Sequence, residues 1–171
     1  MTIVVNLFAG PGSGKSTLAH GLMHELKSNG VSAEFAHEWI KHPVWQGRTD
    51  FPQYYVWAKQ QKLIDGLVGK VDIIVTDSPT LLTIVYGDNE PYALRQLAFA
   101  KWQQGPKSLN VYVDRVKDYW AAGRTQTEEE AKTLDGLIHN GLLHAYGLEH
   151  AHTEAPGFSI RTLARQASNM L

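Results

Sequence analysis

A glycine-rich loop near the start of the chain constrains the fold more than any other feature. Residues 9–17 read Ala-Gly-Pro-Gly-Ser-Gly-Lys-Ser-Thr, after an apolar, β-branched run over residues 2–8 and before a leucine-periodic segment over residues 16–29. Glycines allow a tight turn in which successive backbone N–H groups point at phosphate oxygens, and the required context is a strand before the loop and a helix after it. The pattern predicts a Walker A loop, with Ala9 in place of the usual first glycine.

The same loop predicts the cofactors. The side chain of Lys15 can reach the β- and γ-phosphates of a nucleotide, and the hydroxyl of Ser16 is a ligand for Mg²⁺. We therefore expect ATP and Mg²⁺ as cofactors, with the nucleotide held by Gly10, Pro11, Gly12, Ser13, Gly14, Lys15, Ser16 and Thr17.

Strand-like and helix-like segments alternate along the rest of the chain. Further strands are expected at residues 31–37, 71–76, 108–114 and 147–153, and helices at 79–86, 91–102, 128–143 and 160–170. Another helix is expected after Asp50, with Gln53 closing a capping box. This alternation predicts an α/β, three-layer P-loop kinase fold: a parallel sheet of about five strands, helices on both faces and an Arg-containing lid at about residues 115–130. We expect a single domain over residues 1–171.

Composition narrows the class of protein. Of the 171 residues 43% are hydrophobic and 19% charged, as in a folded soluble domain, and the net charge of -1 counts mildly against bulk electrostatic binding of DNA. The lack of cysteine excludes disulfides and thiolate chemistry. No apolar run approaches the ~20 residues of a membrane span, so we expect a cytoplasmic protein without a membrane partner. We interpret the histidines at 139, 144, 150 and 152 as scattered surface or packing residues.

Two acidic residues follow predicted strands. Glu38 comes after the second strand, where a carboxylate can accept a proton from an acceptor hydroxyl, or can instead stabilise the dipole of its own helix. Asp77 ends the third strand, where it can hold Mg²⁺ together with Ser16, or can instead cap the next helix. A regulatory GTPase would need D-x-x-G and N-K-x-D motifs, which do not occur, so the short chain favours a kinase.

Two arginines follow the fourth predicted strand. Arg115 and Arg124 are candidates for lid residues that neutralise a transferring phosphoryl group. An arginine beside the acidic residues 128–130 could instead form a surface ion pair. We predict Lys15, Glu38, Asp77, Arg115 and Arg124 as the catalytic set.

Four segments carry a resemblance to a known family. FAGPGSGKST, HEWIK, TDSPTLLTIVYG and DRVKDYWAAGRTQTEEEAKTLD together resemble bacteriophage P-loop kinases that are related to thymidylate, deoxynucleoside and nicotinamide-riboside kinases. One branch of these kinases phosphorylates the hydroxymethyl group of 5-hydroxymethyluracil within DNA. The resemblance covers most of residues 3–138. It implies that Glu38 is a general base, that Asp77 is the acidic end of strand three, and that Arg115 and Arg124 are lid arginines.

Aromatic and basic residues between the second and third strands predict the acceptor site. Aromatic faces can stack on a base or a flipped-out nucleotide, and basic side chains can hold phosphates, although helical spacing also suits core packing. The candidate substrate-binding residues are Trp39, Lys41, Arg48, Tyr54 and Trp57. Gln53, Gln60 and Gln61 are weaker candidates for reading a pyrimidine edge, and residues 153–157 for contacting adenine.

The favoured function is phosphorylation of 5-hydroxymethyluracil in phage DNA, with modified DNA as the partner. The alternatives are a deoxynucleoside monophosphate kinase, a nucleoside or nicotinamide-riboside kinase, and a non-catalytic nucleotide-dependent binding module. The paired acids and arginines disfavour the last, because a binding protein gains nothing from stabilising a transition state.

Overall fold

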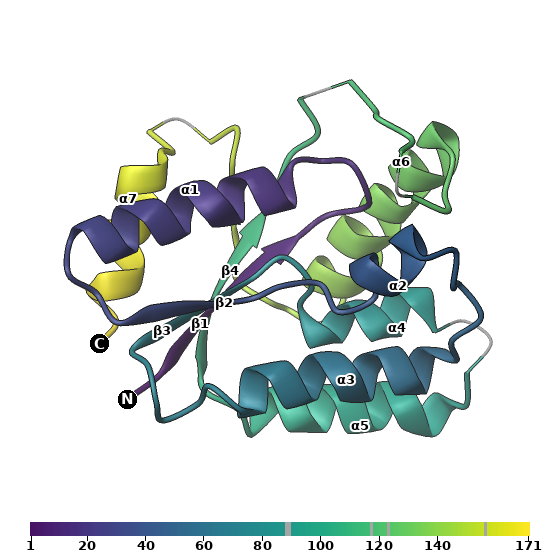
Figure 1. The fold of residues 1–171 in the computed structure, drawn as a ribbon, viewed down its shortest axis with the longest axis horizontal. Helices are drawn as coiled ribbons and strands as arrows, with labels where there is room; N and C mark the ends of the chain where they lie inside the picture. Colours follow the sequence, from purple (N-terminus) through teal and green to yellow (C-terminus); the bar gives the residue numbers. More distant parts are fainter. Residues whose placement is uncertain (88–89, 117, 123, 156) are drawn as a thin grey trace.

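The computed structural model describes residues 1–87, 90–116, 118–122, 124–155 and 157–171. Within them five parallel strands form one sheet in the order β2-β3-β1-β4-β5 (Figure 1). The strands are β1 (Ile3–Phe8), β2 (Ala33–Ala36), β3 (Ile73–Thr76), β4 (Lys107–Tyr112) and β5 (Ala151–His152). Because β1 and β3 are buried along their whole length, their sequences are almost entirely apolar, with only Asn6 and Thr76 as polar residues. The predicted α/β fold with a parallel sheet is confirmed.

Helices cover both faces of the sheet. On one face α1 (Lys15–Ser28) packs against α7 (Ile160–Ser168), and their apolar side chains join Ile3, Val5 and Leu7 of β1 in one core. On the other face Val4 contacts a cluster that contains Ile64 of α3 (Gln53–Asp65). The alternating side chains of β1 therefore link the two helical layers through the sheet.

The remaining helices lie away from α1 and α7 (Figure 1). They are α2 (Lys41–Trp45), η1 (Thr80–Leu82), α4 (Thr83–Tyr86), α5 (Tyr92–Gln103), α6 (Glu128–Gly136) and the π-helix η2 (Leu137–His144). Phe8 of β1 packs with apolar residues of η1, α4 and η2. No helix in the described ranges is long and apolar enough to cross a membrane.

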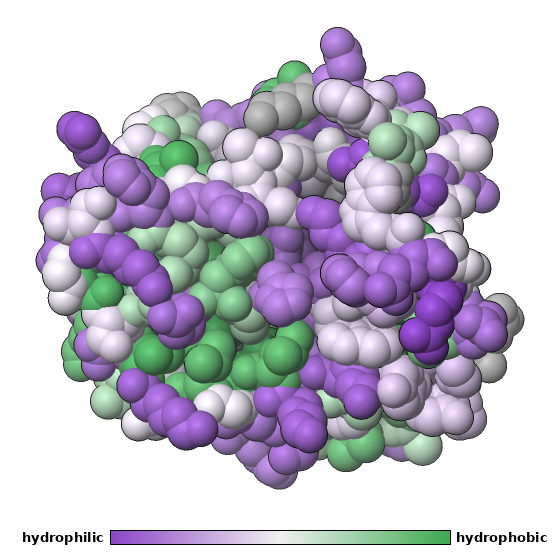
Figure 2. All heavy atoms as spheres, viewed as in Figure 1, coloured by the Kyte–Doolittle hydropathy of each residue, from purple (hydrophilic) through white to green (hydrophobic). Residues whose placement is uncertain are grey.

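Part of the molecular surface is largely apolar. Figure 2 shows apolar side chains gathered below α1, near β2 and β3. Val31, which precedes β2, and Phe35 of β2 are partly buried and pack against the core that contains α1. The polar residues predicted to bind phosphate lie elsewhere, where the parallel strands end.

Several predicted boundaries were wrong. The fifth strand pairs only over Ala151–His152, and β2 is limited to Ala33–Ala36. The Asp50 capping box does not form: Pro52 is the N-cap of α3, and the Gln53 N–H donates to Glu90 Oε1 at 2.7 Å. A carboxylate distant in sequence satisfies the first backbone donor of the helix, and no local pattern could have indicated it.

Candidate active site

A cavity of about 440 Å³ opens at the carboxyl ends of β1, β2 and β3. This is the end at which ligands bind in open parallel sheets. Its wall combines the glycine-rich loop, the residues that follow β2 and β3, the helices α2 and α3, and part of the segment 122–126. Of the predicted site residues, the cavity is lined by Pro11, Gly12, Gly14, Lys15, Ser16, Thr17, Glu38, Lys41, Trp57, Asp77 and Arg124.

The glycine-rich loop is shaped for a close backbone approach. Gly12 and Gly14 have φ values of 81° and 104°, in the left-handed region that favours glycine. A Cβ on Gly12 would lie 2.8 Å from Tyr119 Cδ2. Ser13 is buried, and its hydroxyl donates to the Gly10 carbonyl at 3.2 Å. The loop therefore depends on glycine for both its conformation and its packing.

Lys15 lies folded over the loop. Its Nζ donates to the carbonyls of Ala9 at 2.7 Å and Gly10 at 2.8 Å. Burial lowers the pKa of Lys15, while the carboxylates of Glu38 and Asp77 act in the opposite direction. An anion entering the cavity would stabilise the charged lysine, so the loop is suited to phosphate.

Ser16 and Asp77 meet in the cavity wall. The Ser16 hydroxyl donates to Asp77 Oδ2 at 2.5 Å, and Lys41 Nζ lies 3.5 Å from the same hydroxyl. Asp77 does not cap the following helix, because the N-cap of η1 is Pro79. Mg²⁺ prefers oxygen ligands of these two kinds, and the adjacent hydroxyl and carboxylate therefore fit that ion.

Glu38 is joined to Asp77 through its backbone. Its N–H donates to Asp77 Oδ1 at 3.0 Å, and its side chain lines the cavity. Burial raises the pKa of the Glu38 carboxyl, Lys15 opposes this shift, and Asp77 adds to it. No acidic residue lies in the first turn of α2, so Glu38 does not stabilise that helix dipole. A carboxyl with a raised pKa at a cavity wall is suited to proton transfer.

Gln60 has a structural role that the sequence did not reveal. Its Oε1 accepts the Trp39 N–H at 2.9 Å, and its Nε2 donates to the carbonyl of His37 at 3.2 Å and weakly to that of Ala36 at 3.4 Å. The buried amide thus holds the backbone on both sides of Glu38. Because these contacts use both the oxygen and the nitrogen of the amide, Gln60 is not suited to hydrogen bonding with a pyrimidine edge, for which it was one of the weaker candidates.

Asp135 of α6 holds the glycine-rich loop in place. No sequence motif indicated this role of Asp135. Its Oδ1 accepts the Gly10 N–H at 2.7 Å, and its Oδ2 pairs with Arg115 Nε at 2.7 Å. Arg115 Nη2 in turn donates to the Pro11 carbonyl at 2.8 Å. The ion pair is mostly shielded from solvent, with side chains 12% and 14% exposed, and is not the surface pair considered from the sequence.

The two predicted lid arginines have different positions. Arg124 lines the cavity and lies over the Tyr119 ring at 5.4 Å from its centroid. Arg115 does not line it, but its Nη1 is buried near Gly12 and has no hydrogen-bond partner among the described residues. Residues 117 and 123 of the predicted lid lie outside the described residues.

The predicted acceptor residues divide into two groups. Lys41 and Trp57 line the cavity. Trp39 instead packs edge-on against Phe51, Arg48 lies over the same ring, and Tyr54 is 56% exposed. The cavity is lined by Phe51 but not by Trp39, Arg48 or Tyr54.

Two buried polar atoms in the cavity wall have no partner. Trp57 Nε1 and Thr83 Oγ1 make no hydrogen bond in the described part of the chain. Both residues line the cavity, and Tyr86, whose pKa burial raises, lies beside them in its wall. An unsatisfied buried donor costs free energy, so these atoms are candidates for hydrogen bonding to a ligand.

Thr153 and Glu154, which directly follow β5, are bonded to Asp114. The Thr153 hydroxyl donates to Asp114 Oδ2 at 3.1 Å and accepts the Asp114 N–H at 2.9 Å. Residue 156, part of the predicted adenine contact, lies outside the described residues.

Comparison with solved structures shows that the fold is shared with known proteins. A mutant of the APS kinase CysC of Mycobacterium tuberculosis has a TM-score of 0.51 at 15% identity, covering 99% of this chain and 96% of that chain. The crystal structure of the protein APE1195 has a TM-score of 0.50 at 18% identity, covering 99% and 94%. No protein-family model and no curated protein matches the chain in sequence. The chain therefore shares the overall fold of this APS kinase, and at these identities the likeness concerns the fold alone.

Proposed function

We propose that this chain is an ATP-dependent phosphotransferase whose acceptor is a nucleotide-like hydroxyl compound. The observation that carries the proposal is the set of groups around one cavity. Lys15, the Ser16–Asp77 pair, Glu38 and Arg124 all border it, and its lining also includes the aromatic side chains of Phe51 and Trp57. Phosphoryl transfer requires a cation that binds phosphate, oxygen ligands for a metal ion, and a carboxyl group that can accept a proton.

The phosphate end of the cavity would hold the triphosphate of ATP. Lys15 would exchange its bonds to the loop carbonyls for phosphate oxygens, and the loop N–H groups would donate to the same anion. Ser16 and Asp77 would hold Mg²⁺, which neutralises phosphate charge when bound. Arg124 in the cavity wall is the proposed donor to the transferring group, and Arg115, which does not line the cavity, is proposed to support the glycine-rich loop through its bond to the Pro11 carbonyl.

Glu38 is the proposed general base. It would take the proton of the acceptor hydroxyl as that oxygen forms a bond to the γ-phosphorus and the bond from this phosphorus to the bridging oxygen of ADP breaks. The products are ADP, the phosphorylated acceptor and protonated Glu38. A general base is most effective when its pKa lies near the working pH, and burial shifts the pKa of Glu38 upward, toward neutral pH.

The favoured acceptor is 5-hydroxymethyluracil in DNA, presented as a flipped-out base. This preference rests on the sequence resemblance and is supported by the aromatic wall, which includes Phe51 and Trp57. The free Trp57 Nε1 would suit a carbonyl of the base, and Thr83 Oγ1 offers a second polar contact. Lys41 beside the cavity would suit a backbone phosphate.

A free nucleoside or nicotinamide riboside is the second candidate acceptor. The net charge of -1 favours it, because a DNA-binding surface is usually basic. A deoxynucleoside monophosphate is less suited to the site, because its phosphate already carries a nucleophilic oxygen and needs no base at Glu38.

The test is transfer of labelled γ-phosphate from ATP to a panel of acceptors. The panel contains DNA with 5-hydroxymethyluracil, unmodified DNA, thymidine, nicotinamide riboside and thymidine monophosphate, with Lys15→Ala as control. Label on the modified DNA alone would support the favoured acceptor. Label on a free nucleoside would replace that acceptor and keep the kinase, and ATP binding without any labelled product would overturn the phosphotransferase.

A further inference from the structure

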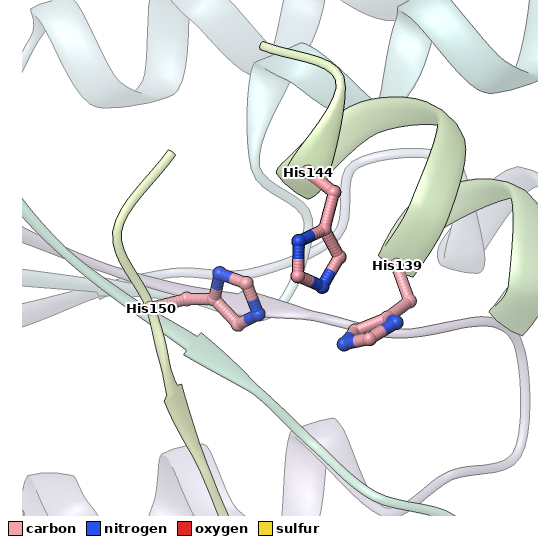
Figure 3. Close-up of side chains that lie close together, drawn as sticks. All are labelled: His139, His144 and His150. Carbon is pink, nitrogen blue, oxygen red and sulfur yellow. The ribbon is translucent and has the colours of Figure 1, made fainter. Parts of the chain in front are cut away.

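Histidines that appear scattered in the sequence converge at one place in the fold. His139 and His144 belong to η2, His150 directly precedes β5, and Figure 3 shows their rings gathered together. One ring nitrogen of each lies within 4.8 Å of those of the other two. His152 of β5 joins them, with its Nε2 at 3.3 Å from His139 Nε2. The interpretation of these four residues as scattered was therefore wrong.

The hydrogen bonds of the rings leave nitrogen lone pairs facing inward. His152 Nδ1 lies 3.0 Å from Asp114 Oδ1, and His139 Nδ1 lies 3.0 Å from Asn140 Oδ1. Because both partners are oxygen acceptors, each Nδ1 carries the proton in a neutral ring and each Nε2 is bare. Two bare nitrogens that face each other at 3.3 Å repel unless a proton or a metal ion lies between them.

His150 is oriented in the same manner. Its Nδ1 lies 2.8 Å from the Leu148 carbonyl, which fixes the proton there and leaves Nε2 free. A metal-binding histidine commonly donates its other nitrogen to a carboxylate or a carbonyl, as His152 and His150 do here. Nitrogens bound about 2.0–2.1 Å from a tetrahedral zinc ion lie about 3.4 Å apart, and the 3.3 Å separation of His139 and His152 already matches this value.

The local fold also brings these residues together. A π-helix is rare and occurs often at functional sites, and η2 contributes two of the rings. The Tyr112 ring packs against His139 and His152, with centroids 4.9 and 5.3 Å away. The cluster shares no residue with the cavity that contains Ser16 and Asp77.

We propose that His139, His144, His150 and His152 bind one divalent transition-metal ion of the zinc type. Imidazole nitrogens select Zn²⁺, Co²⁺, Ni²⁺ or Cu²⁺ over Mg²⁺, which prefers oxygen. Four protein ligands make a closed, structural site. The ion would fasten η2 to β5, a strand of only two residues that has few backbone bonds of its own.

The test uses the full chain without an affinity tag, stripped with a chelator and then titrated with Zn²⁺ by calorimetry. Co²⁺ is titrated in parallel, because its visible absorption distinguishes four-coordinate from six-coordinate binding. His144→Asn is the main variant, since this ring is exposed and its loss should not disturb folding. His24→Asn is the control, since His20 and His24 form the pair on α1 that could bind zinc adventitiously.

We expect one equivalent of zinc and a four-coordinate Co²⁺ spectrum. His144→Asn and His150→Asn should each weaken zinc binding by about 100-fold or more, beyond the 10–100-fold typical of outer-shell changes. Zinc should also raise the melting temperature of the unaltered chain and not that of His144→Asn. Absence of binding, binding unchanged in His144→Asn, or binding lost in His24→Asn would each overturn the proposal.

Discussion

Replacing Asp135 by alanine should destabilise the fold through the glycine-rich loop. The change leaves the Arg115 guanidinium without its carboxylate and removes the acceptor of the Gly10 N–H. Both partners of the ion pair are mostly shielded from solvent, with 12% and 14% of their side chains exposed. Breaking such a pair from one side costs about 3–5 kcal/mol, because the remaining charge stays buried.

This free energy converts into a shift in melting temperature. A loss of 1 kcal/mol lowers the melting temperature of a domain of this size by about 2–4 °C, so Asp135→Ala should lower it by about 12 °C. The assay is thermal unfolding followed by circular dichroism. Lys132→Ala on the same helix is the matched control, because its pair with Glu128 is exposed and should contribute no measurable stability.

Equal decreases in melting temperature for Asp135→Ala and Lys132→Ala would refute the stabilising role of the Asp135 contacts. The double variant Asp135→Leu/Arg115→Met should be more stable than Asp135→Leu alone, because it leaves no unpaired charge at the position of this ion pair.

Three further predictions concern the cavity. Glu38→Gln should raise the melting temperature at pH 8, because the pKa of Glu38 is raised in the folded state and the ionised carboxylate is therefore destabilising. This advantage should disappear near pH 4.3, about the unperturbed glutamate pKa, where the carboxyl becomes protonated in the folded and the unfolded states. Equal melting curves for both proteins at pH 8 would contradict this prediction. Trp57→Phe should raise the KM for the acceptor by about tenfold with an unchanged KM for ATP, the cost of one lost hydrogen bond, and an unchanged acceptor KM would remove Trp57 Nε1 from the site. Gln60→Ala should lower kcat by about tenfold without weakening ATP binding, because it releases the backbone around Glu38; a normal kcat measured at saturating substrate would refute the positioning role.

Local sequence patterns predicted the parallel sheet and the glycine-rich turn. The apolar run before the loop and the glycines within it carry their structure in adjacent residues, so β1 and the turn at Gly12 could be placed without tertiary information. The acidic residues after β2 and β3 could be placed for a related reason. Parallel strands end at one edge of the sheet, so residues that follow different strands meet there.

Contacts between distant segments could not be predicted in this way. Asp135, Gln60 and Glu90 each satisfy backbone donors far from them in sequence, and no motif marks such partners. The histidine cluster was missed because its ligands come from a π-helix and an edge strand. A π-helix shifts side chains relative to the 3.6-residue period, so the spacing of His139 and His144 gives no metal-site pattern.

The proton-accepting role of Glu38 in one phosphoryl-transfer cavity is the central claim, and the rate of γ-phosphate transfer as a function of pH tests it most directly. The rate is measured for the unaltered chain and for Glu38→Gln with the best acceptor of the panel, and ATP binding is measured separately. We predict that kcat/KM of the unaltered chain falls as the pH is lowered, with a midpoint above about pH 4.3. Glu38→Gln should lower the rate of transfer by about 10²–10⁴-fold and keep the affinity for ATP. Transfer by Glu38→Gln at the unaltered rate and with the same pH profile would contradict the account.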